Sequence, residues 1–261
     1  MPIVRFMIQG GKYRIGRVLI CITNPVEAQK SISELATSGI GGFVCFSNVR
    51  MVRYANKHQA YAELMNDSLM NLPDGTPLTW CAKIWGIKGV QCTPGPTLFK
   101  SFMQSAEGDL HHFLLGDTDK TLTEIVKRYQ TANHHIVGTY SLPFVDVEDY
   151  DYDGIAKMIE DSGANLVWTA MRAPKQDEFN ARISKLLPHV VFVGVGRAFR
   201  TSIGEFKEVP VWAQRMGLSG FWLSRGSFWE ESIFYAGAIL SLIKYMAQII
   251  WWRMNGRKCD E

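Results

Sequence analysis

The feature of this sequence that most constrains its fold is the alternation of short apolar runs with amphipathic stretches. The apolar runs cover residues 17–22, 42–46, 112–115, 134–137, 165–170 and 190–195. Between them, residues 25–37, 118–131 and 153–162 have helical patterns, and the first of these follows Asn24 as N-cap with Pro25 at the first helical position. Alternating strands and helices predict an α/β, Rossmann-like fold with a mainly parallel, doubly wound sheet. Ligands of such sheets bind beyond the carboxyl ends of the strands.

Composition narrows the class of protein. Hydrophobic residues make up 47% of the chain and charged residues 20%, which is typical of a globular protein. The net charge of +3 is too small for a protein that coats nucleic acid, so we expect no nucleic-acid partner. The five cysteines form no C-x-x-C pair, and Gly10, Gly11 and Lys12 interrupt any signal-peptide pattern. Both observations favour a reducing, cytoplasmic location.

The C-terminal stretch differs from the rest. Residues 232–252 are mostly apolar, but Lys244 lies within them and basic residues follow. Flanking tryptophans and cations suit a helix lying in a membrane interface, with a buried core helix and a full membrane span as the alternatives, in that order. We therefore expect an α/β domain over residues 1–225 and a membrane-associating helical tail over residues 226–261.

Asp74 lies between Pro73 and Gly75, a combination typical of a turn. It follows a helical pattern over residues 61–70 and precedes an apolar run. Two interpretations stay open: Asp74 is only a turn residue, or it is a carboxylate at the edge of a pocket that takes a proton from a hydroxyl.

Two further segments follow predicted strands. Pro174 and Gln176 come after the apolar run 165–170, where a helix N-terminus would favour an anion, although an ordinary helix start explains the same residues. Gly194 and Gly196 give only G-x-G, because Phe199 occupies the place of the third glycine of a dinucleotide fingerprint. A nicotinamide site is therefore weakly supported, whereas close approach of the backbone to a phosphate or sugar stays open.

Two acidic patterns raise the question of a metal. Asp117 and Asp119 form a D-x-D that would hold a divalent cation on a nucleotide, or would cap a helix, which we prefer. Aspartates 149, 151 and 153 match the spacing of a calcium loop, but no helix pattern precedes them. Asp153 as an N-cap explains the same residues, so we expect no metal ligands.

In order along the chain, these pieces resemble the WecG/TagA/CpsF glycosyltransferases (glycosyltransferase family 26) over residues 15–225. The resemblance rests on Asn48 after a strand, Pro73-Asp74-Gly75, Thr93-Pro94-Gly95-Pro96, Leu114-Leu115-Gly116, Ile136-Val137-Gly138, Ala173-Pro174-Lys175-Gln176, Gly194-Val195-Gly196, Pro210-Val211-Trp212 and Gly217-Leu218.

The resemblance implies inverting, metal-independent and cofactor-free transfer from a UDP-sugar to a polyprenyl-diphosphate-linked sugar, in surface polysaccharide synthesis at the inner face of the membrane. It makes Asp74 the catalytic base and Gln176 a nucleotide-sugar contact, and it places arginines in the tail. The substrate-binding residues that we expect are Ser47, Asn48, Gly95, Gly116, Pro174, Gln176, Gly194, Arg197 and Arg225. The sequence leaves a homo-oligomer open.

Some positions depart from the family pattern. Phe46 stands where the family has threonine, so that only Ser47 offers a hydroxyl, and Arg200 stands where the family has aspartate. Two alternatives therefore stay open. One is a metal-dependent glycosyltransferase that uses Asp117 and Asp119, and the other is a non-catalytic nucleotide-sugar-binding protein at a membrane complex.

Overall fold

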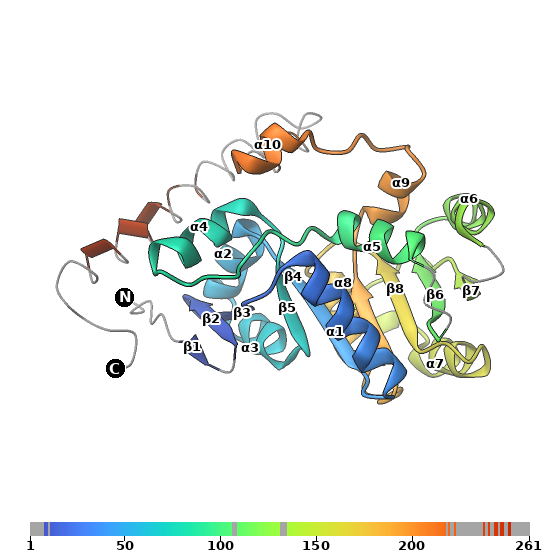
Figure 1. The fold of residues 1–261 in the computed structure, drawn as a ribbon. Coiled ribbons are helices and arrows are strands. Elements are labelled where there is room, and N and C mark those ends of the chain that lie inside the picture. Colours follow the sequence, from blue (N-terminus) through green and yellow to red (C-terminus); the bar gives the residue numbers. More distant parts are fainter. Residues whose placement is uncertain are drawn as a thin grey trace.

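Six strands form one parallel sheet, and three others form a small antiparallel sheet (Figure 1). The computed structural model describes residues 8–9, 11–105, 109–130 and 135–217, with single positions between 219 and 251. The parallel sheet has the strand order β5 (Met70–Pro73), β4 (Gly42–Ser47), β9 (Val191–Gly194), β8 (Leu166–Ala170), β6 (His111–Gly116), β7 (His135–Tyr140). The small sheet has the order β1 (Ile8–Gln9), β2 (Lys12–Ile15), β3 (Val18–Cys21). The predicted α/β, Rossmann-like class is confirmed.

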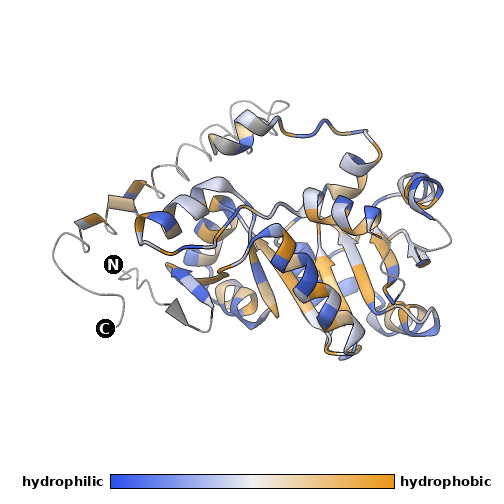
Figure 2. Ribbon diagram, in the orientation of Figure 1, coloured by the Kyte–Doolittle hydropathy of each residue, from blue (hydrophilic) through white to orange (hydrophobic). Residues whose placement is uncertain are grey.

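Helices cover both faces of the parallel sheet and bury two apolar clusters. One face is covered by α1 (Pro25–Thr37), α5 (Gly95–Gln104), α6 (Asp119–Tyr129) and α9 (Ala198–Ser202). The other face is covered by α2 (Val49–Lys57), α3 (Gln59–Asp67), α4 (Thr76–Ile84), η1 (Val147–Asp149), α7 (Tyr152–Asp161) and α8 (Lys175–Ile183), together with the small sheet. The short α10 (Val211–Arg215) follows α9. Figure 2 shows the central strands as largely hydrophobic, as expected for strands covered on both sides.

Local signals explain the elements that the sequence predicted well. The side chain of Asn24 accepts hydrogen bonds from the backbone N–H groups of Val26 and Glu27, so α1 begins at Pro25 as expected. All five residues of β8 are buried, which fits its continuous apolar run. At α7 the N-cap is Asp151, which accepts from Gly154, and not Asp153 as predicted. Asp153 instead lies in the first turn, where its charge suits the helix dipole.

Two elements depart from the expected pattern. The predicted strand at residues 17–22 exists as β3, but it pairs with β2 and lies outside the parallel sheet. The sequence does not predict strand β5, since the helical pattern extends to residue 70. Helix α3 in fact ends at Asp67, and β5 pairs with β4 at the edge of the sheet. Pro73 at its end is tolerated because an edge strand does not need every N–H.

Candidate active site

The carboxyl ends of β4 and β5 bring Asn48 and Asp74 together. The two strands pair in parallel with Ser47 opposite Pro73, and the N–H of Asp74 donates to the carbonyl of Ser47 at 2.6 Å. A Cβ placed on Gly75 would lie 3.8 Å from the Cβ of Asn48. The turn that the sequence predicts at Asp74 therefore lies at the ligand-binding edge of the sheet.

The environment of Asp74 tunes its carboxyl group for proton transfer. The side chain is half-buried, and burial raises its pKa to about 6, against the lowering effect of a hydrogen bond from Asn48. Asn48 is itself fixed, since its side-chain oxygen accepts from the backbone N–H of Met51 at the start of α2. A carboxylate with a pKa just below neutral can accept a proton from a substrate hydroxyl at working pH.

The segment before α5 closes one side of this site. The N–H of Thr93 donates to the carbonyl of Pro73 at 2.8 Å. Burial, followed by the nearby charge of Asp74, raises the pKa of Cys92 to about 12, so its thiol is neutral beside the carboxyl group. Gly95 begins α5, and a Cβ there would lie 3.6 Å from Val195. The loop after β9 therefore packs directly against this segment.

Gln176 joins the loops that follow β8 and β9. Its side-chain oxygen accepts from the backbone N–H of Met171 at 3.1 Å and of Gly196 at 2.8 Å. The side chain is only 4% exposed. It occupies the space beside Gly194, where an added Cβ would lie 2.3 Å from the amide nitrogen of Gln176. Pro174 is the N-cap residue of α8, and it lies within the first of these two loops.

An ion pair joins the loop after β6 to helix α9. Gly116 ends β6 with a positive φ of 97°, and an added Cβ would lie 2.9 Å from the carbonyl oxygen of Ala170. Asp117 also has a positive φ, 59°, and its carboxylate accepts hydrogen bonds at 3.0 Å from Nε and Nη2 of Arg200. This bidentate contact disfavours Asp117 as a cation ligand.

Arg197 is half-buried at the start of α9, and its guanidinium carbon lies 5.0 Å from the ring centre of Phe206. Arg200 lies over the same ring at 5.7 Å. Burial lowers the pKa of Arg197 from its ordinary value. Within the described part of the chain, no three His, Cys, Asp or Glu residues gather closely enough to hold a metal ion.

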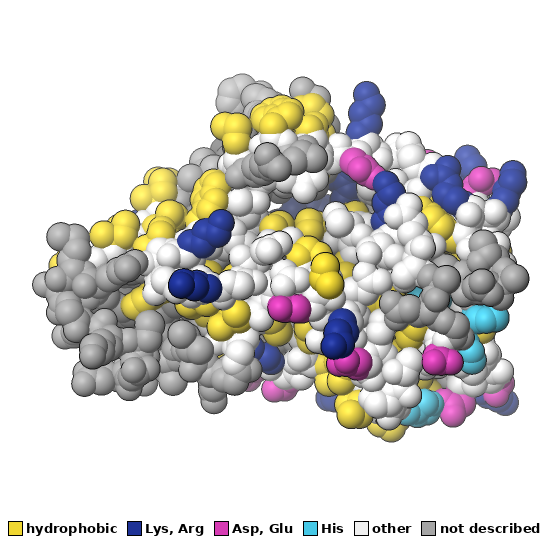
Figure 3. Space-filling model, in the orientation of Figure 1, with side chains coloured by type: hydrophobic (Ala, Val, Ile, Leu, Met, Phe, Trp, Pro, Cys, Tyr) yellow, Lys and Arg dark blue, Asp and Glu magenta, His cyan; other side chains and the backbone are white. Residues whose placement is uncertain are grey.

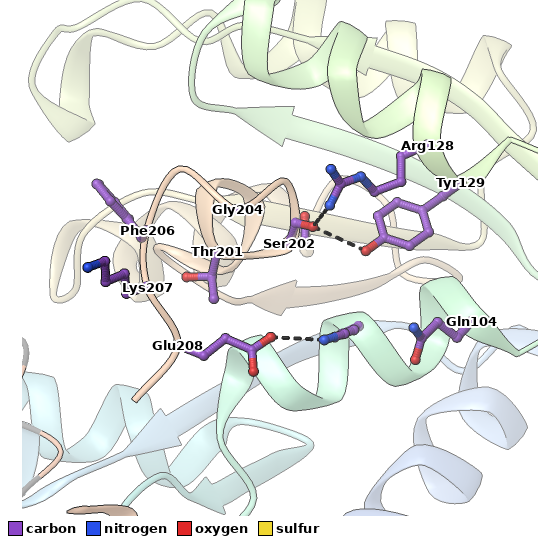
Figure 4. Close-up of a pocket in the computed structure, with 10 residues that line it drawn as sticks. Gln104, Arg128, Tyr129, Thr201, Ser202, Gly204, Phe206, Lys207 and Glu208 are labelled. Carbon is purple, nitrogen blue, oxygen red and sulfur yellow. Dashed lines mark hydrogen bonds and ion pairs between the residues drawn. The ribbon is translucent and has the colours of Figure 1, made fainter. Parts of the chain in front are cut away.

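A hollow of about 580 Å³ opens between α5, α6 and α9 (Figure 4). Three charged side chains of its wall have partners within the chain: Lys100 pairs with Glu208 at 2.9 Å, and Arg128 donates to the carbonyl oxygen of Ser202 at 2.6 Å. None of the predicted site residues lines it. It is a groove beside α9, whereas most of the predicted site residues that the structure describes lie at the strand ends.

Most of the predicted site residues lie at this edge, but their side chains differ in orientation. Ser47 is fully buried, and its hydroxyl donates to the side-chain oxygen of Asn71 at 2.8 Å, toward the interior. Arg225 lies outside the described residues. The sequence does not reveal that Cys92 lies beside Asp74, although Cys92 directly precedes the T-P-G-P motif. It also missed the role of Arg200, whose partner stands 83 residues earlier.

Apolar side chains are exposed at α10 and along the tail. Trp212 is 55% exposed and Met216 60%, and Figure 3 shows hydrophobic side chains gathered over α10. Leu240, Ile243 and Trp251, described positions of the predicted tail, are also more than half exposed. Among the residues that the structure describes, no helix combines the length and apolarity needed to cross a membrane.

Comparisons with a family profile and with individual known proteins point to the same family. The profile of the "Glycosyl transferase WecG/TagA/CpsF family" matches residues 13–257. An N-acetylglucosaminyldiphosphoundecaprenol N-acetyl-beta-D-mannosaminyltransferase of Bacillus subtilis (strain 168) is 24% identical over 185 residues, 70% of this chain and 71% of that protein. The protein of the same name from Staphylococcus aureus (strain NCTC 8325 / PS 47) is 25% identical over 186 residues, 70% of each chain.

Proposed function

Because the chain belongs to the WecG/TagA/CpsF family of glycosyltransferases, we propose that it transfers a sugar from a UDP-sugar to a polyprenyl-diphosphate-linked sugar, with inversion and without a metal. The names of the relatives supply the acceptor class, a lipid-diphosphate-linked N-acetylglucosamine, and suggest an N-acetylmannosamine-type donor. The observation that carries the proposal is the half-buried carboxyl of Asp74, tuned to a pKa of about 6 at the carboxyl edge of the sheet.

In the proposed reaction, the acceptor hydroxyl oxygen attacks the anomeric carbon of the donor from the side opposite the diphosphate. The carbon–oxygen bond to the diphosphate breaks, UDP leaves with that electron pair, and Asp74 takes the hydroxyl proton. One displacement inverts the anomeric centre. Asn48, which donates a hydrogen bond to Asp74, orients the carboxylate toward the acceptor.

The leaving diphosphate develops negative charge and needs donors that are already in place. The start of α6 after Gly116 supplies backbone N–H groups near the strand ends. At the start of α8 the N–H groups of residues 176–178 already donate to the carbonyls of Arg172 and Pro174, so α8 contributes mainly its helix dipole. Arg197 is the described cation that we propose for this role, with Arg225 as a second one. Gly95 and Pro174 complete the proposed donor wall. Ser47 and Gly194 are buried behind it: the carbonyl of Ser47 accepts from the N–H of Asp74, and Gly194 borders the side chain of Gln176.

On the acceptor side, α2 carries Arg50, Arg53 and Lys57 and no acidic residue. The helix begins next to Asn48, so its cations extend away from the proposed base. This arrangement suits a diphosphate that joins the acceptor sugar to its lipid. We propose that residues 226–261 associate with the cytoplasmic face of the membrane, and the exposed Trp212, Leu240 and Trp251 support this contact.

The test measures UDP release from a panel of UDP-sugars with a synthetic polyprenyl-diphosphate-linked N-acetylglucosamine. Asp74→Asn should keep UDP binding and lower turnover about a hundredfold or more, because a general base contributes about that factor. Asp161→Asn is the matched control. This exposed acid is the last residue of α7, before β8 begins, and therefore lies near the amino ends of the strands, away from Asp74. Near-normal turnover of Asp74→Asn would refute the base assignment, and UDP binding without turnover of any sugar would favour a non-catalytic binding protein.

A further inference from the structure

The loops after β8 and β9 separate beyond their last shared hydrogen bond, and one side chain bridges the gap. The last bond of the ladder joins the N–H of Val195 to the carbonyl of Thr169 at 2.9 Å. Beyond it, the N–H groups of Met171 and Gly196 both donate to the side-chain oxygen of Gln176, at 3.1 and 2.8 Å. That oxygen therefore replaces the sheet partners that these two amides would otherwise have.

The other end of the Gln176 amide is also enclosed by protein. A hydrogen bond from Gln176 is among the contacts that lower the pKa of Asp177, which burial raises to about 6. Asp177 is 2% exposed and accepts a hydrogen bond from the hydroxyl of Tyr61. The amide nitrogen fills the space beside Gly194, where an added Cβ would lie 2.3 Å from it. The amide of Gln176 is thus held by contacts within the chain, and the residue as a whole is buried.

We infer that Gln176 is a positioning residue, which acts on sugar transfer by holding the loops 171–174 and 195–197 at a fixed separation, and not by touching the sugar. The inference rests on the proposed function, because these loops form the proposed donor wall. Arg197 directly follows Gly196, so the position of this cation depends on the same hydrogen bond.

The physical consequence of losing this oxygen is specific. Two partly buried N–H groups would lose their acceptor, and the loops would move apart until water could satisfy them. Donor binding and the alignment of the leaving diphosphate would both weaken. The free protein, with no sugar present, would already show the change.

The test compares Gln176→Met, which keeps the length of the side chain but removes the acceptor, with wild type. We expect hydrogen exchange of the Met171 and Gly196 amides in the ligand-free protein to accelerate about tenfold or more. The KM for the UDP-sugar should rise and kcat should fall. Gln130→Met is the matched control, because the side chain of Gln130 also accepts a hydrogen bond from a backbone N–H, that of Ile136 in β7, at 3.0 Å. It should accelerate exchange at Ile136 and leave the kinetics unchanged.

Gly194→Ala provides a second route to the same change, since its methyl group displaces the Gln176 amide and adds no group that recognises a sugar. It should reproduce the kinetic defect, and the double variant should be no worse than the more severe single variant. Unchanged exchange at both amides in Gln176→Met, combined with a raised KM, would overturn the inference in favour of direct contact. The inference would also be overturned if the kinetic defects of Gln176→Met and Gly194→Ala multiplied in the double variant. Faster exchange in a protein that transfers no sugar would refute the proposed function alone.

Discussion

The burial of Asp74 predicts that the proposed catalytic carboxylate destabilises the fold. Burial raises its pKa from the ordinary 3.8 to about 6. This pKa difference lowers the free energy of unfolding by about 3 kcal/mol at neutral pH, where Asp74 is ionised. Because the side chain is only half-buried, solvent screening reduces the expected effect to about 1–3 kcal/mol. Asp74→Asn should therefore be more stable than wild type at pH 7 by this amount, while it loses turnover.

The sign of the pH dependence follows from the raised pKa. The protonated form of Asp74 is favoured in the folded state, so its stabilising contribution is fully present below about pH 4 and is lost as pH rises through about 6. The advantage of Asp74→Asn should therefore be near zero at pH 4, grow between pH 4 and 6, and stay constant above. The raised pKa of Asp177 is present in both proteins and cancels in the difference.

Denaturant unfolding of both proteins at pH 4, 5, 6, 7 and 8 measures this difference directly, with Asp161→Asn as the control of equal charge change. An Asn variant that is less stable than wild type at pH 7 would refute the reasoning. A stability difference that does not change with pH would refute it equally, because the effect would then not arise from ionisation at position 74.

Four further outcomes follow from the same structure. The rate kcat/KM should fall about tenfold per pH unit below about pH 6 and be constant above, since the base must be ionised; a rate that rises toward lower pH would contradict this. Initial rates of sugar transfer should be unchanged by EDTA. Arg200→Ala should lower the free energy of unfolding by about 1–3 kcal/mol, because the carboxylate of Asp117, which is 8% exposed, loses its bidentate partner. Tyr61→Phe should lower the free energy of unfolding by about 1–3 kcal/mol at pH 8 and by less at pH 5, where Asp177 is protonated; denaturant titrations at the two pH values measure both effects.

Elements with strong local signals were predictable from the sequence. Helix α1 was predicted at its observed bounds because its start depends on Asn24 and Pro25, which are adjacent in the sequence. Strands β6, β8 and β9 were predicted to within one or two residues, since each is a continuous buried run. The family resemblance was confirmed, and it located the loops that gather at the carboxyl edge of the sheet.

Elements whose placement depends on distant partners were not predictable in this way. Residues 18–21 have an ordinary strand pattern, and only their pairing with β2 places them outside the parallel sheet. Strand β5 contains Asn71 and Pro73, which weaken the strand signal. Asn71 is buried there because its side chain accepts from Ser47 and donates to the carbonyl of Leu19, a contact across 52 residues.

The segment Gly194-Val195-Gly196 has a structural reason for its glycines that the sequence alone does not reveal. In the sequence it is an incomplete dinucleotide fingerprint, in which glycines would make room for a phosphate. In the structure, Gly194 makes room for the side chain of Gln176, and the N–H of Gly196, which has a φ of 55°, donates to the same side chain. The need for glycine at position 194 therefore comes from a glutamine 18 residues earlier in the chain. A glycine in a βα loop constrains whatever approaches its backbone, and the approaching group here belongs to the protein itself.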